Sequence, residues 1–430
     1  MIIGMLTAMS AAVPPPSPQA TPAARGRGDA CPGALRLHAA DDGALARVRL
    51  PGGVLSTGQA RALAVAARRL GDGDLHLTSR GNVQLRGLPE GCGAELAELL
   101  DAAGLLPSRE HERVRNIVAS PLSGLDADGL RDVRPWLTAL DAALCASRDA
   151  VGLSGRFLFA LDDGRGDMSG LGADVLVRAV PDGGAWLAPG SVRVSAEDAP
   201  RAASAAAGAF LEAARSGGRR AWRMSDLGLS GSELGRLVRD RLRAEGIGHE
   251  DHPEPAGCAD GPPPGIVGDA VSVHIPLGRL SAHQWDELTH VAAGELRLTP
   301  WRGVVLPTAG TAAERAGALA RLGAAGLVTD PGSPWLHVGA CIGRPGCARS
   351  HADVRGDAAR TLDAAGDPGV PLYWSGCERR CGHPRSGHVD VVAAPGGGYH
   401  LTAAPAGRRP RTAFAADPSG IPAALAAITS

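Results

Sequence analysis

Two segments of the chain repeat the same order of apolar and polar positions. Residues 48–59 (VRLPGGVLSTGQ) match residues 273–284 (VHIPLGRLSAHQ) at a constant separation of 225 positions. In the first copy, residues 48–50 predict a strand and residues 57–70, rich in Ala and Arg, predict a helix. A pattern that recurs at a fixed separation indicates a duplicated unit.

A stretch of alternating polarity follows the first copy. Every second residue from 76 to 86 is polar, which predicts one strand over residues 75–85 with its polar side chains on one face. Two interpretations stay open at this point: an ordinary solvated sheet face, or a surface that binds a carboxylate-rich ligand. The polar residues are His76, Thr78, Arg80, Asn82, Gln84 and Arg86.

Further matches extend the repeat at a separation of 221 positions. The matched pairs are 75–78 (LHLT) with 296–299 (LRLT), 118–120 (VAS) with 339–341 (GAC), and 154–156 (SGR) with 375–377 (SGC). On this alignment Ser120 corresponds to Cys341, and Arg156 corresponds to Cys377. The second half therefore carries thiols where the first half has none.

The repeat predicts an α+β protein made of two pseudo-twofold-related halves. Each half has a smaller unit followed by a larger mixed α/β unit, and a segment with five prolines joins the halves. The expected boundaries are a disordered lead at 1–30, smaller units at 31–105 and 267–330, a larger unit without metal ligands at 106–245, a linker at 246–266 and a larger metal-binding unit at 331–430.

The composition narrows the possible partners. The chain has 430 residues with 44 basic and 45 acidic side chains, so nothing in its charge favours nucleic acid or a membrane surface. No run of about 18 apolar residues predicts a membrane span, and the start lacks the basic region of a secretory signal, so we expect a cytoplasmic protein. The chain contains no Lys. Any cationic role must fall to Arg, which binds carboxylates bidentately.

Four of the eight cysteines lie in one C-terminal stretch: Cys341, Cys347, Cys377 and Cys381. Two pairs on Gly-rich segments are suited to wrap a metal, and four thiolates from two loops can hold a [4Fe-4S] cluster. The alternatives are a Cys₄ zinc site, which usually has tighter spacing, and four unrelated buried cysteines. The cluster fits the spacing best. The remaining cysteines, at 31, 92, 145 and 258, have no partner at a useful spacing and receive no role.

Several arginines indicate an anionic ligand. Any one of them is an ordinary surface residue, but a convergent set describes a site for a large, carboxylate-rich small molecule between the halves. The set consists of Arg80, Arg86, Arg115, Arg156, Arg297 and Arg302.

These motifs resemble those of the nitrite and sulfite reductase superfamily. Residues 77–87 (LTSRGNVQLRG) are similar to its first tetrapyrrole-facing strand, residues 115–116 (RN) to its Arg-Asn pair, and the cysteine spacing to its cluster motif. The resemblance implies that the smaller units are ferredoxin-like half-domains, and that Cys381 also bridges to a sirohaem iron. It implies catalytic roles for Arg80, Arg115 and Arg156. It implies tetrapyrrole binding by Thr78, Asn82, Gln84, Arg86, Asn116, Arg297 and Arg302.

The chain also departs from the reductases. They carry two Lys residues one position apart that bind and protonate the small oxyanion, and these positions look like Arg156 and Leu158 here, so a proton donor is lost. Residues 30–33 (ACPG) and 298–302 (LTPWR) resemble the precorrin-3B synthase branch. That resemblance implies O2-dependent hydroxylation and lactone formation on the tetrapyrrole precorrin-3A, with an electron donor, the [4Fe-4S] cluster, and either sirohaem or an additional iron. The alternatives are a sirohaem-dependent sulfite or nitrite reductase and an iron–sulfur electron-transfer protein.

Overall fold

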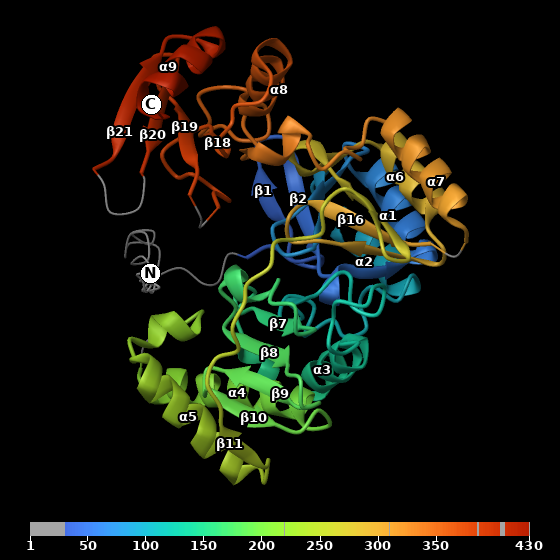
Figure 1. Ribbon diagram of the computed structural model, residues 1–430, viewed down its shortest axis with the longest axis vertical. Coiled ribbons are helices and arrows are strands. Elements are labelled where there is room, and N and C mark those ends of the chain that lie inside the picture. Colours follow the sequence, from blue (N-terminus) through green and yellow to red (C-terminus); the bar gives the residue numbers. More distant parts are fainter. Residues whose placement is uncertain (1–30, 219, 309, 385–386, 405–408, 430) are drawn as a thin grey trace, which may run out of the picture.

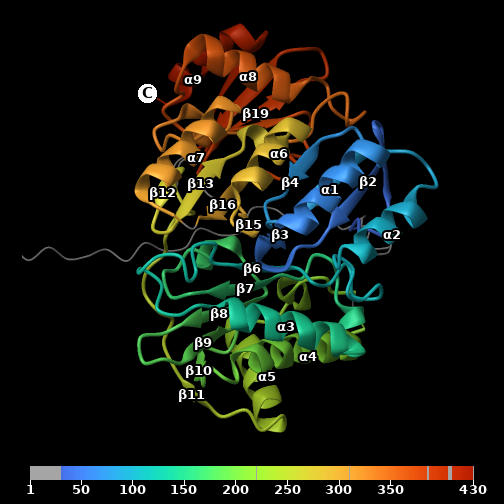
Figure 2. The same ribbon diagram turned by 90° about the vertical axis from the view of Figure 1, so that its right-hand side faces the viewer.

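The computed structural model describes residues 31–218, 220–308, 310–384, 387–404 and 409–429. The predicted lead at 1–30 lies outside the described residues. The described chain forms three tiers (Figure 2), with the two smaller units side by side in the middle and one larger unit at each end. This arrangement of mixed sheets and helices in two related halves confirms the predicted α+β fold class.

The middle tier consists of two antiparallel sheets that exchange one strand each. β14 of the second half pairs with β4 in the first sheet, and β3 of the first half pairs with β15 in the second sheet. One hydrophobic core runs through both units. The first sheet has the order β1 (His38–Ala40), β2 (Gly43–Val48), β5 (Val83–Leu88), β4 (Leu75–Leu77) and β14 (Arg279–Leu280). The second has the order β12 (Gly265–Val267), β13 (Ala270–His274), β16 (Gly303–Pro307), β15 (Glu295–Leu298) and β3 (Val54–Ser56).

The helices of the middle tier preserve the sequence repeat. α1 (Thr57–Leu70), at the predicted position, and α6 (Ala282–Val291) both start with a capping box. In each box the Ser hydroxyl accepts the N–H of the Gln three positions later, and the Gln side chain accepts the Ser N–H. Trp285 of α6 is fully buried and donates its indole N–H to Ala60 O of α1 at 2.8 Å. The two helices therefore join the halves. α2 (Gly93–Ala102) and α7 (Ala312–Ala324) complete this tier (Figure 1).

The predicted single strand over residues 75–85 was wrong, because it is a hairpin. β4 and β5 are joined by a turn in which Thr78 N–H donates to Asn82 O at 2.9 Å and Gly81 takes a φ of 64° that favours glycine. The turn residues are also polar at every second position. The alternation therefore runs through the turn, although the turn is not part of a strand. His76 lies directly opposite Gln84. Their side chains still share one face of the sheet, as the alternation predicted.

The larger units have related cores. The first contains a six-stranded sheet in the order β11 (His249–Asp251), β10 (Val192–Val194), β9 (Ala185–Ala188), β8 (Val175–Ala179), β7 (Phe159–Asp162) and β6 (Ile117–Ala119), packed against α3 (Arg134–Ala146), α4 (Ala199–Ser216) and α5 (Gly231–Ala244). The second contains β17 (Val338–Ala340), β18 (Leu372–Ser375), β19 (Val389–Ala393), β20 (Tyr399–Ala403) and β21 (Arg411–Ala415), with α8 (Val354–Ala365) and α9 (Ile421–Thr429). In both, the first two strands along the chain pair in parallel.

The segment predicted as a linker at 246–266 is held against the first larger unit. Its start forms β11, an edge strand of that unit's sheet, and its end enters β12. The guanidinium of Arg178 donates to the consecutive carbonyls of Pro255, Ala256 and Gly257 at 3.2, 3.0 and 2.9 Å. Prolines have no backbone N–H to donate to a sheet or helix, but the carbonyl oxygens of such a segment remain good acceptors. The connection is therefore a fixed strap across the front of the molecule (Figure 1).

The parallel strand pairs correct the predicted correspondence between the halves. Ser120 N–H donates to Leu161 O, as Cys341 N–H donates to Trp374 O. Ser120 therefore does correspond to Cys341. The paired strands start 42 residues apart in the first half and 34 in the second. Because of this longer connection, Gly164, and not Arg156, corresponds to Cys377.

Ion pairs occupy the edge of the first larger unit that corresponds to the thiol-bearing edge of the second. Arg165 donates to Asp126 at 2.7 and 2.9 Å and to Asp163 at 2.8 and 2.9 Å. Asp167 lies next to this network and accepts the Ser120 hydroxyl at 2.6 Å. Burial, together with the neighbouring carboxylates, raises the pKa of Asp167 to about 7. This edge is closed by its own side chains.

The raised pKa of Asp167 predicts a distinctive dependence of stability on pH. In the unfolded chain Asp167 ionises near pH 4, whereas in the folded protein it keeps its proton until about pH 7. The stability that it contributes is present below pH 4 and is lost as the pH rises to 7, at up to about 1.4 kcal/mol per pH unit. We expect Asp167→Asn to be more stabilising at pH 8 than at pH 5 in urea unfolding followed by circular dichroism. Asp260→Asn, at an exposed position, serves as the control. Equal effects of Asp167→Asn at both pH values would contradict the assignment.

Candidate functional site

Two loops at one edge of the second larger unit carry the four clustered cysteines. Cys341 directly follows β17, and Cys377 comes two residues after β18 ends. Because β17 and β18 are parallel, their carboxyl ends meet at the same edge and bring the two loops together. Cys347 and Cys381 follow within the same loops. We call Cys341, Cys347, Cys377 and Cys381 the four-thiol set.

Backbone groups hold the loops of the four-thiol set in place. Gly376 N–H donates to Cys341 Sγ at 3.2 Å, and a side chain on Gly376 would collide with Ser350. The Tyr373 hydroxyl donates to Cys381 O at 2.8 Å. Burial raises the pKa of Cys381, Arg379 opposes this shift, and the other three thiols add to it. The four thiols therefore share one electrostatic environment.

The four thiols can be compared with the geometry of a zinc site. A tetrahedral zinc ion with Zn–S bonds of about 2.3 Å would bring its sulfur ligands to within about 4 Å of one another. Among the described residues, the only group of three or more ligating side chains with all ligand atoms within 4.8 Å is Asp162, Asp163 and Asp167. Among the described residues, no three of the four sulfurs thus lie this close together. Four thiolates are the usual ligands of a [4Fe-4S] cluster, and the cluster stays a prediction.

The carboxylates of Asp162, Asp163 and Asp167 have hydrogen-bond and ion-pair partners within the protein. Asp162 accepts the backbone N–H groups of Gly164, Gly166 and Met168 at 2.9–3.0 Å. Asp163 is paired with Arg165, as described above. These carboxylates are satisfied by the protein itself.

A row of polar side chains crosses the first sheet beside the thiol loops. Arg47 lies opposite Gln84, Gln84 opposite His76, and His76 opposite Arg279, across β2, β5, β4 and β14. Residues that are directly opposite in neighbouring strands point to the same face. We call these four residues the polar row. Arg86, two residues beyond Gln84 on β5, points to this face as well.

The thiol loops touch one end of this face. Arg86 donates to both oxygens of Asp42 at 2.8 Å and to Gly346 O at 2.9 Å. Arg355 donates to Cys341 O at 3.2 Å and lies 3.4 Å from His76 Nδ1. Burial, followed by the charges of neighbouring arginines, lowers the pKa of Arg355 to about 10. The cation beside the cluster loop is therefore poorly neutralised.

A second set of guanidinium groups lies at the other end of the face. Arg49 and Arg80 both donate to Gly155 O, at 3.3 and 3.5 Å, and Arg47 belongs to the polar row. The pKa of Arg47 and that of Arg80 are each lowered to about 10, first by burial and then by other arginines. Within the described chain, no carboxylate forms an ion pair with these three residues. We call Arg47, Arg49 and Arg80 the arginine group.

Several residues with a predicted site role are engaged in internal contacts. Arg115 donates to both oxygens of Asp141 at 2.7 Å. Asn82 and Asn116 are buried and bond to each other through their amides at 3.2 Å. Arg297 is also buried, and bonds to Glu295 and to two backbone carbonyls. The structure therefore uses these four residues to join elements of the fold.

The other predicted residues lie closer to the face of the first sheet. Thr78 Oγ accepts the N–H groups of Arg80 and Asn82, which fixes the hairpin turn. Arg156 is exposed and its guanidinium lies 4.4 Å from the centre of the Trp222 ring. Arg302, with a φ of 59°, lies near Tyr373. The binding and catalytic roles of all the predicted residues stay predictions.

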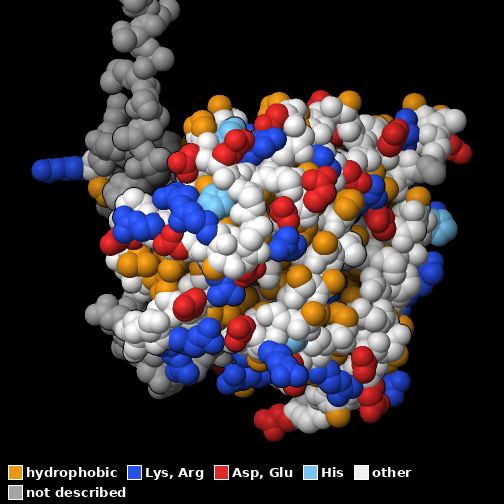
Figure 3. Space-filling view, turned by 90° about the horizontal axis from the view of Figure 1, so that it is seen from below, with side chains coloured by type: hydrophobic (Ala, Val, Ile, Leu, Met, Phe, Trp, Pro, Cys, Tyr) orange, Lys and Arg blue, Asp and Glu red, His pale blue; other side chains and the backbone are white. Residues whose placement is uncertain are grey.

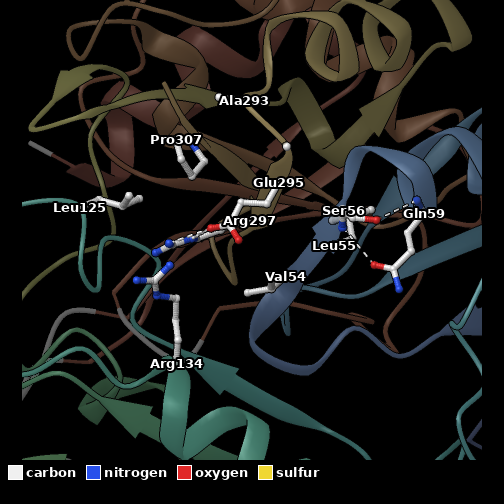
Figure 4. Close-up of a pocket in the computed structure, with 11 residues that line it drawn as sticks. Val54, Leu55, Ser56, Gln59, Leu125, Arg134, Ala293, Glu295, Arg297 and Pro307 are labelled. Carbon is white, nitrogen blue, oxygen red and sulfur yellow. Dashed lines mark hydrogen bonds and ion pairs between the residues drawn. The ribbon is translucent and has the colours of Figure 1, made fainter. Parts of the chain in front are cut away.

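A hollow elsewhere in the described chain is a second candidate. It has a volume of about 580 Å³ and is formed where the middle tier meets the first larger unit (Figure 4). Its charged side chains have partners, because Arg297 pairs with Glu295 and Arg134 with Asp132. Its lining contains no cysteine or histidine, and its one carboxylate, Glu295, is paired with Arg297. The thiol loops and the face of the first sheet are therefore the better candidate site.

The sequence alone did not identify three of the cations at this site. Arg47 and Arg49 flank Val48 in the predicted first strand, and their two-residue spacing was a signal that they share a side of the chain. Arg355 gave no such signal. It lies in the first turn of α8 and reaches the site only because that helix follows the first thiol loop.

The surface away from the site has a mixed charge. Figure 3 shows basic and acidic side chains interspersed on the face at the end of the molecule where α5 and β11 lie. Ion pairs at this end include Arg241 with Glu245 and Arg193 with Glu250. No helix in the described ranges is long and apolar enough to span a lipid bilayer.

Comparison with known proteins shows a recognised half domain and several similar enzymes. The model of the nitrite/sulfite reductase ferredoxin-like half domain matches residues 38–103 and 267–321, the two strand-exchanging units. A precorrin-3B synthase from Sinorhizobium sp is 29% identical over 97% of this chain and 91% of its own length. The ferredoxin–nitrite reductase of Synechococcus elongatus is 28% identical over 81% of this chain and 76% of its own length.

Other relatives are longer than this chain or more distant. The chloroplastic ferredoxin–nitrite reductase of Betula pendula is 28% identical over 78% of this chain, which spans only 65% of that enzyme. The solved structure of the Mycobacterium tuberculosis NirA protein superposes with a TM-score of 0.67 at 20% identity, over 88% of this chain and 79% of that protein, which supports the fold. The chain therefore carries the nitrite/sulfite reductase ferredoxin-like half domain at residues 38–103 and 267–321, and over most of its length it is similar to a precorrin-3B synthase and to ferredoxin–nitrite reductases.

Proposed function

We propose that the protein is an iron–sulfur oxidoreductase that oxidises the tetrapyrrole precorrin-3A, as a precorrin-3B synthase. The similarity to the Sinorhizobium synthase supports this proposal because it extends over nearly the whole of both chains, whereas the birch nitrite reductase has a third of its length unmatched. The expected reaction is an O2-dependent hydroxylation with lactone formation. It requires an electron donor besides O2.

The observation that carries the proposal is a sheet face with unneutralised guanidinium groups next to four thiols. The arginine group lies at one end of this face and Arg355 at the other, and burial lowers the pKa of Arg47, Arg80 and Arg355 to about 10. A tetrapyrrole with several carboxylates would supply the missing negative charge at both ends. A small inorganic anion would reach only one end.

The four-thiol set would hold a [4Fe-4S] cluster, which supplies one-electron transfer when it is bound. The protein contributes the surroundings of the thiolates. Gly376 N–H donates to Cys341 Sγ, and a hydrogen bond to a ligating sulfur tunes the reduction potential. Arg355 binds Cys341 O and adds a positive charge next to the same loop. The substrate, precorrin-3A or a small oxyanion, distinguishes the proposed reaction from its main alternative.

That alternative is a sirohaem-dependent sulfite or nitrite reductase, which the nitrite reductase relatives favour. Leu158 argues for the synthase. Its side chain is buried among Val118, Ala160 and Met168, so the position that resembles the second lysine of the reductases provides neither a charge nor a proton. Arg156 remains as a single cation with its guanidinium over Trp222.

The cluster assignment predicts the effect of removing one thiol. Cys377→Ala should lose most of the bound iron and sulfide and the broad visible absorbance of anaerobically purified protein, because three thiolates cannot complete the cluster. Cys92→Ala is the matched control, since Cys92 is a buried thiol at the start of α2 and outside the site. Full iron content in a folded Cys377→Ala protein would exclude the assignment.

The ligand assignment predicts a loss of tetrapyrrole affinity in Arg80→Ala. A hydrogen bond to a charged group contributes about 1.5–3 kcal/mol, so we expect precorrin-3A to bind about 10- to 100-fold more weakly. Arg61→Ala, at an exposed position on α1, provides the control. Affinity can be measured anaerobically by quenching of tryptophan fluorescence. An unchanged dissociation constant would remove Arg80 from the site.

The two candidate reactions predict different spectra and products. We expect anaerobically purified protein to show cluster absorbance, and to oxidise added precorrin-3A only when O2 and a reductant are supplied. The mass of the product, compared with that of precorrin-3A, shows whether an oxygen atom has been inserted. Sirohaem bands together with turnover of sulfite or nitrite, and no oxidation of the tetrapyrrole, would instead establish the reductase.

A further inference from the structure

The thiol of Cys31 lies inside the arginine group, although the sequence gave it no role. Its side chain is buried, with 8% of its surface exposed. Arg49 Nη2 donates to Cys31 Sγ at 3.2 Å, and Arg47 Nη1 lies 3.5 Å from the same sulfur. Cys31 Sγ is also 3.5 Å from Gly155 O, the carbonyl that Arg49 and Arg80 share. One sulfur therefore lies at the meeting point of the arginine group.

Buried guanidinium groups need acceptors, because they carry five N–H donors and no acceptor. Arg49 is only 3% exposed, and it bonds to Arg113 O, Gly155 O and Cys31 Sγ, while its Nη1 has no partner. The carboxyl of Glu112 interacts with Arg49 electrostatically, but it accepts Ala34 N–H, and burial raises its pKa. The acceptors around Arg49 are thus weak or already occupied. An anion would be the best partner for this group of cations.

The Cys31 side chain is packed closely against Gly155. A side chain on Gly155 would come within 3.1 Å of both Cys31 Cβ and Sγ. The segment after Cys31 is fixed as well, since Arg47 N–H donates to Gly33 O at 3.0 Å and Ala34 N–H donates to Glu112 at 2.8 Å. The sulfur therefore cannot move away without breaking the start of the fold.

We propose that Cys31 is a specificity-determining residue whose sulfur takes the place of a small anion within the arginine group. A free oxyanion the size of sulfite or sulfate finds its position filled. A carboxylate arm of a large ligand can still reach Arg80, which approaches Gly155 from the hairpin turn, while the rest of the ligand lies along the polar row. The inference rests on the proposed function, because it explains how the same fold rejects small oxyanions and accepts a tetrapyrrole.

The test is sulfate binding to the full-length, cofactor-loaded protein. Cys31→Ala removes the sulfur and opens the position, so we expect sulfate to bind at least tenfold more tightly than to the wild type in isothermal titration calorimetry at constant ionic strength. Sulfate should also raise the unfolding temperature of Cys31→Ala saturably, with chloride as the reference salt. Cys92→Ala removes a buried thiol outside the site and should behave like the wild type.

If Cys31→Ala does not fold without sulfate, refolding in sulfate but not in chloride supports the inference in the same way, whereas refolding in neither overturns it. Cys31→Ser, which keeps an acceptor of smaller size, should show a weaker sulfate dependence than Cys31→Ala. Equal sulfate affinity in the wild type and Cys31→Ala overturns the inference.

Binding of precorrin-3A is measured separately to distinguish the two proposals. Tetrapyrrole binding by the wild type without a gain of sulfate affinity in Cys31→Ala refutes only the role of Cys31. Gained sulfate affinity without any tetrapyrrole binding by the wild type refutes the proposed function and leaves the filled anion position established.

Discussion

The exchange of one strand between the two half-domains determines where the charged groups of the site lie. β14 adds Arg279 from the second half to the edge of the first sheet, next to His76. The second half then continues into the unit that bears the thiols, so its loops return to the face of that same sheet, where Gly346 O meets Arg86. Without the exchange, the polar row would end at His76. The site is thus a product of the pairing of the halves.

The same arrangement explains why so many cations are left poorly neutralised. Transferring a charged group out of water costs several kcal/mol even after relaxation, and ion pairing recovers that cost only with good geometry. Arg86, Arg115 and Arg165 have such bidentate partners, and the structure uses them to join its parts. Arg47, Arg80 and Arg355 lack them. Cations that the fold itself does not satisfy are typical of a binding site, where the ligand brings the opposite charge.

The sequence was sufficient for the large features and insufficient for those that depend on register. The repeat, the helix at 57–70 and the convergence of the thiol loops follow from periodicity and spacing, which are local properties. The hairpin at 78–82 was missed because its polar residues continue the alternation of the strand. The correspondence of Arg156 with Cys377 failed because one connection is eight residues longer in the first half, and a short match cannot detect such a shift. The partner of Arg115, Asp141, is 26 residues away on α3, and only tertiary structure brings the two together.

Corresponding loops in the two halves carry different side chains. At the edge where the second half carries the four-thiol set, the first half has Ser120 in place of Cys341, and Arg165 bridges Asp126 and Asp163. These bidentate ion pairs neutralise the charges of Arg165, Asp126 and Asp163, so this edge needs no ligand. Among the described residues, no ion pair joins the two loops of the thiol-bearing edge, and burial together with the other three thiols raises the pKa of Cys381. On the proposed function, the duplicated fold keeps a single centre because side chains fill the equivalent position of the first half, and the role proposed for Cys31 applies the same physical principle to an anion.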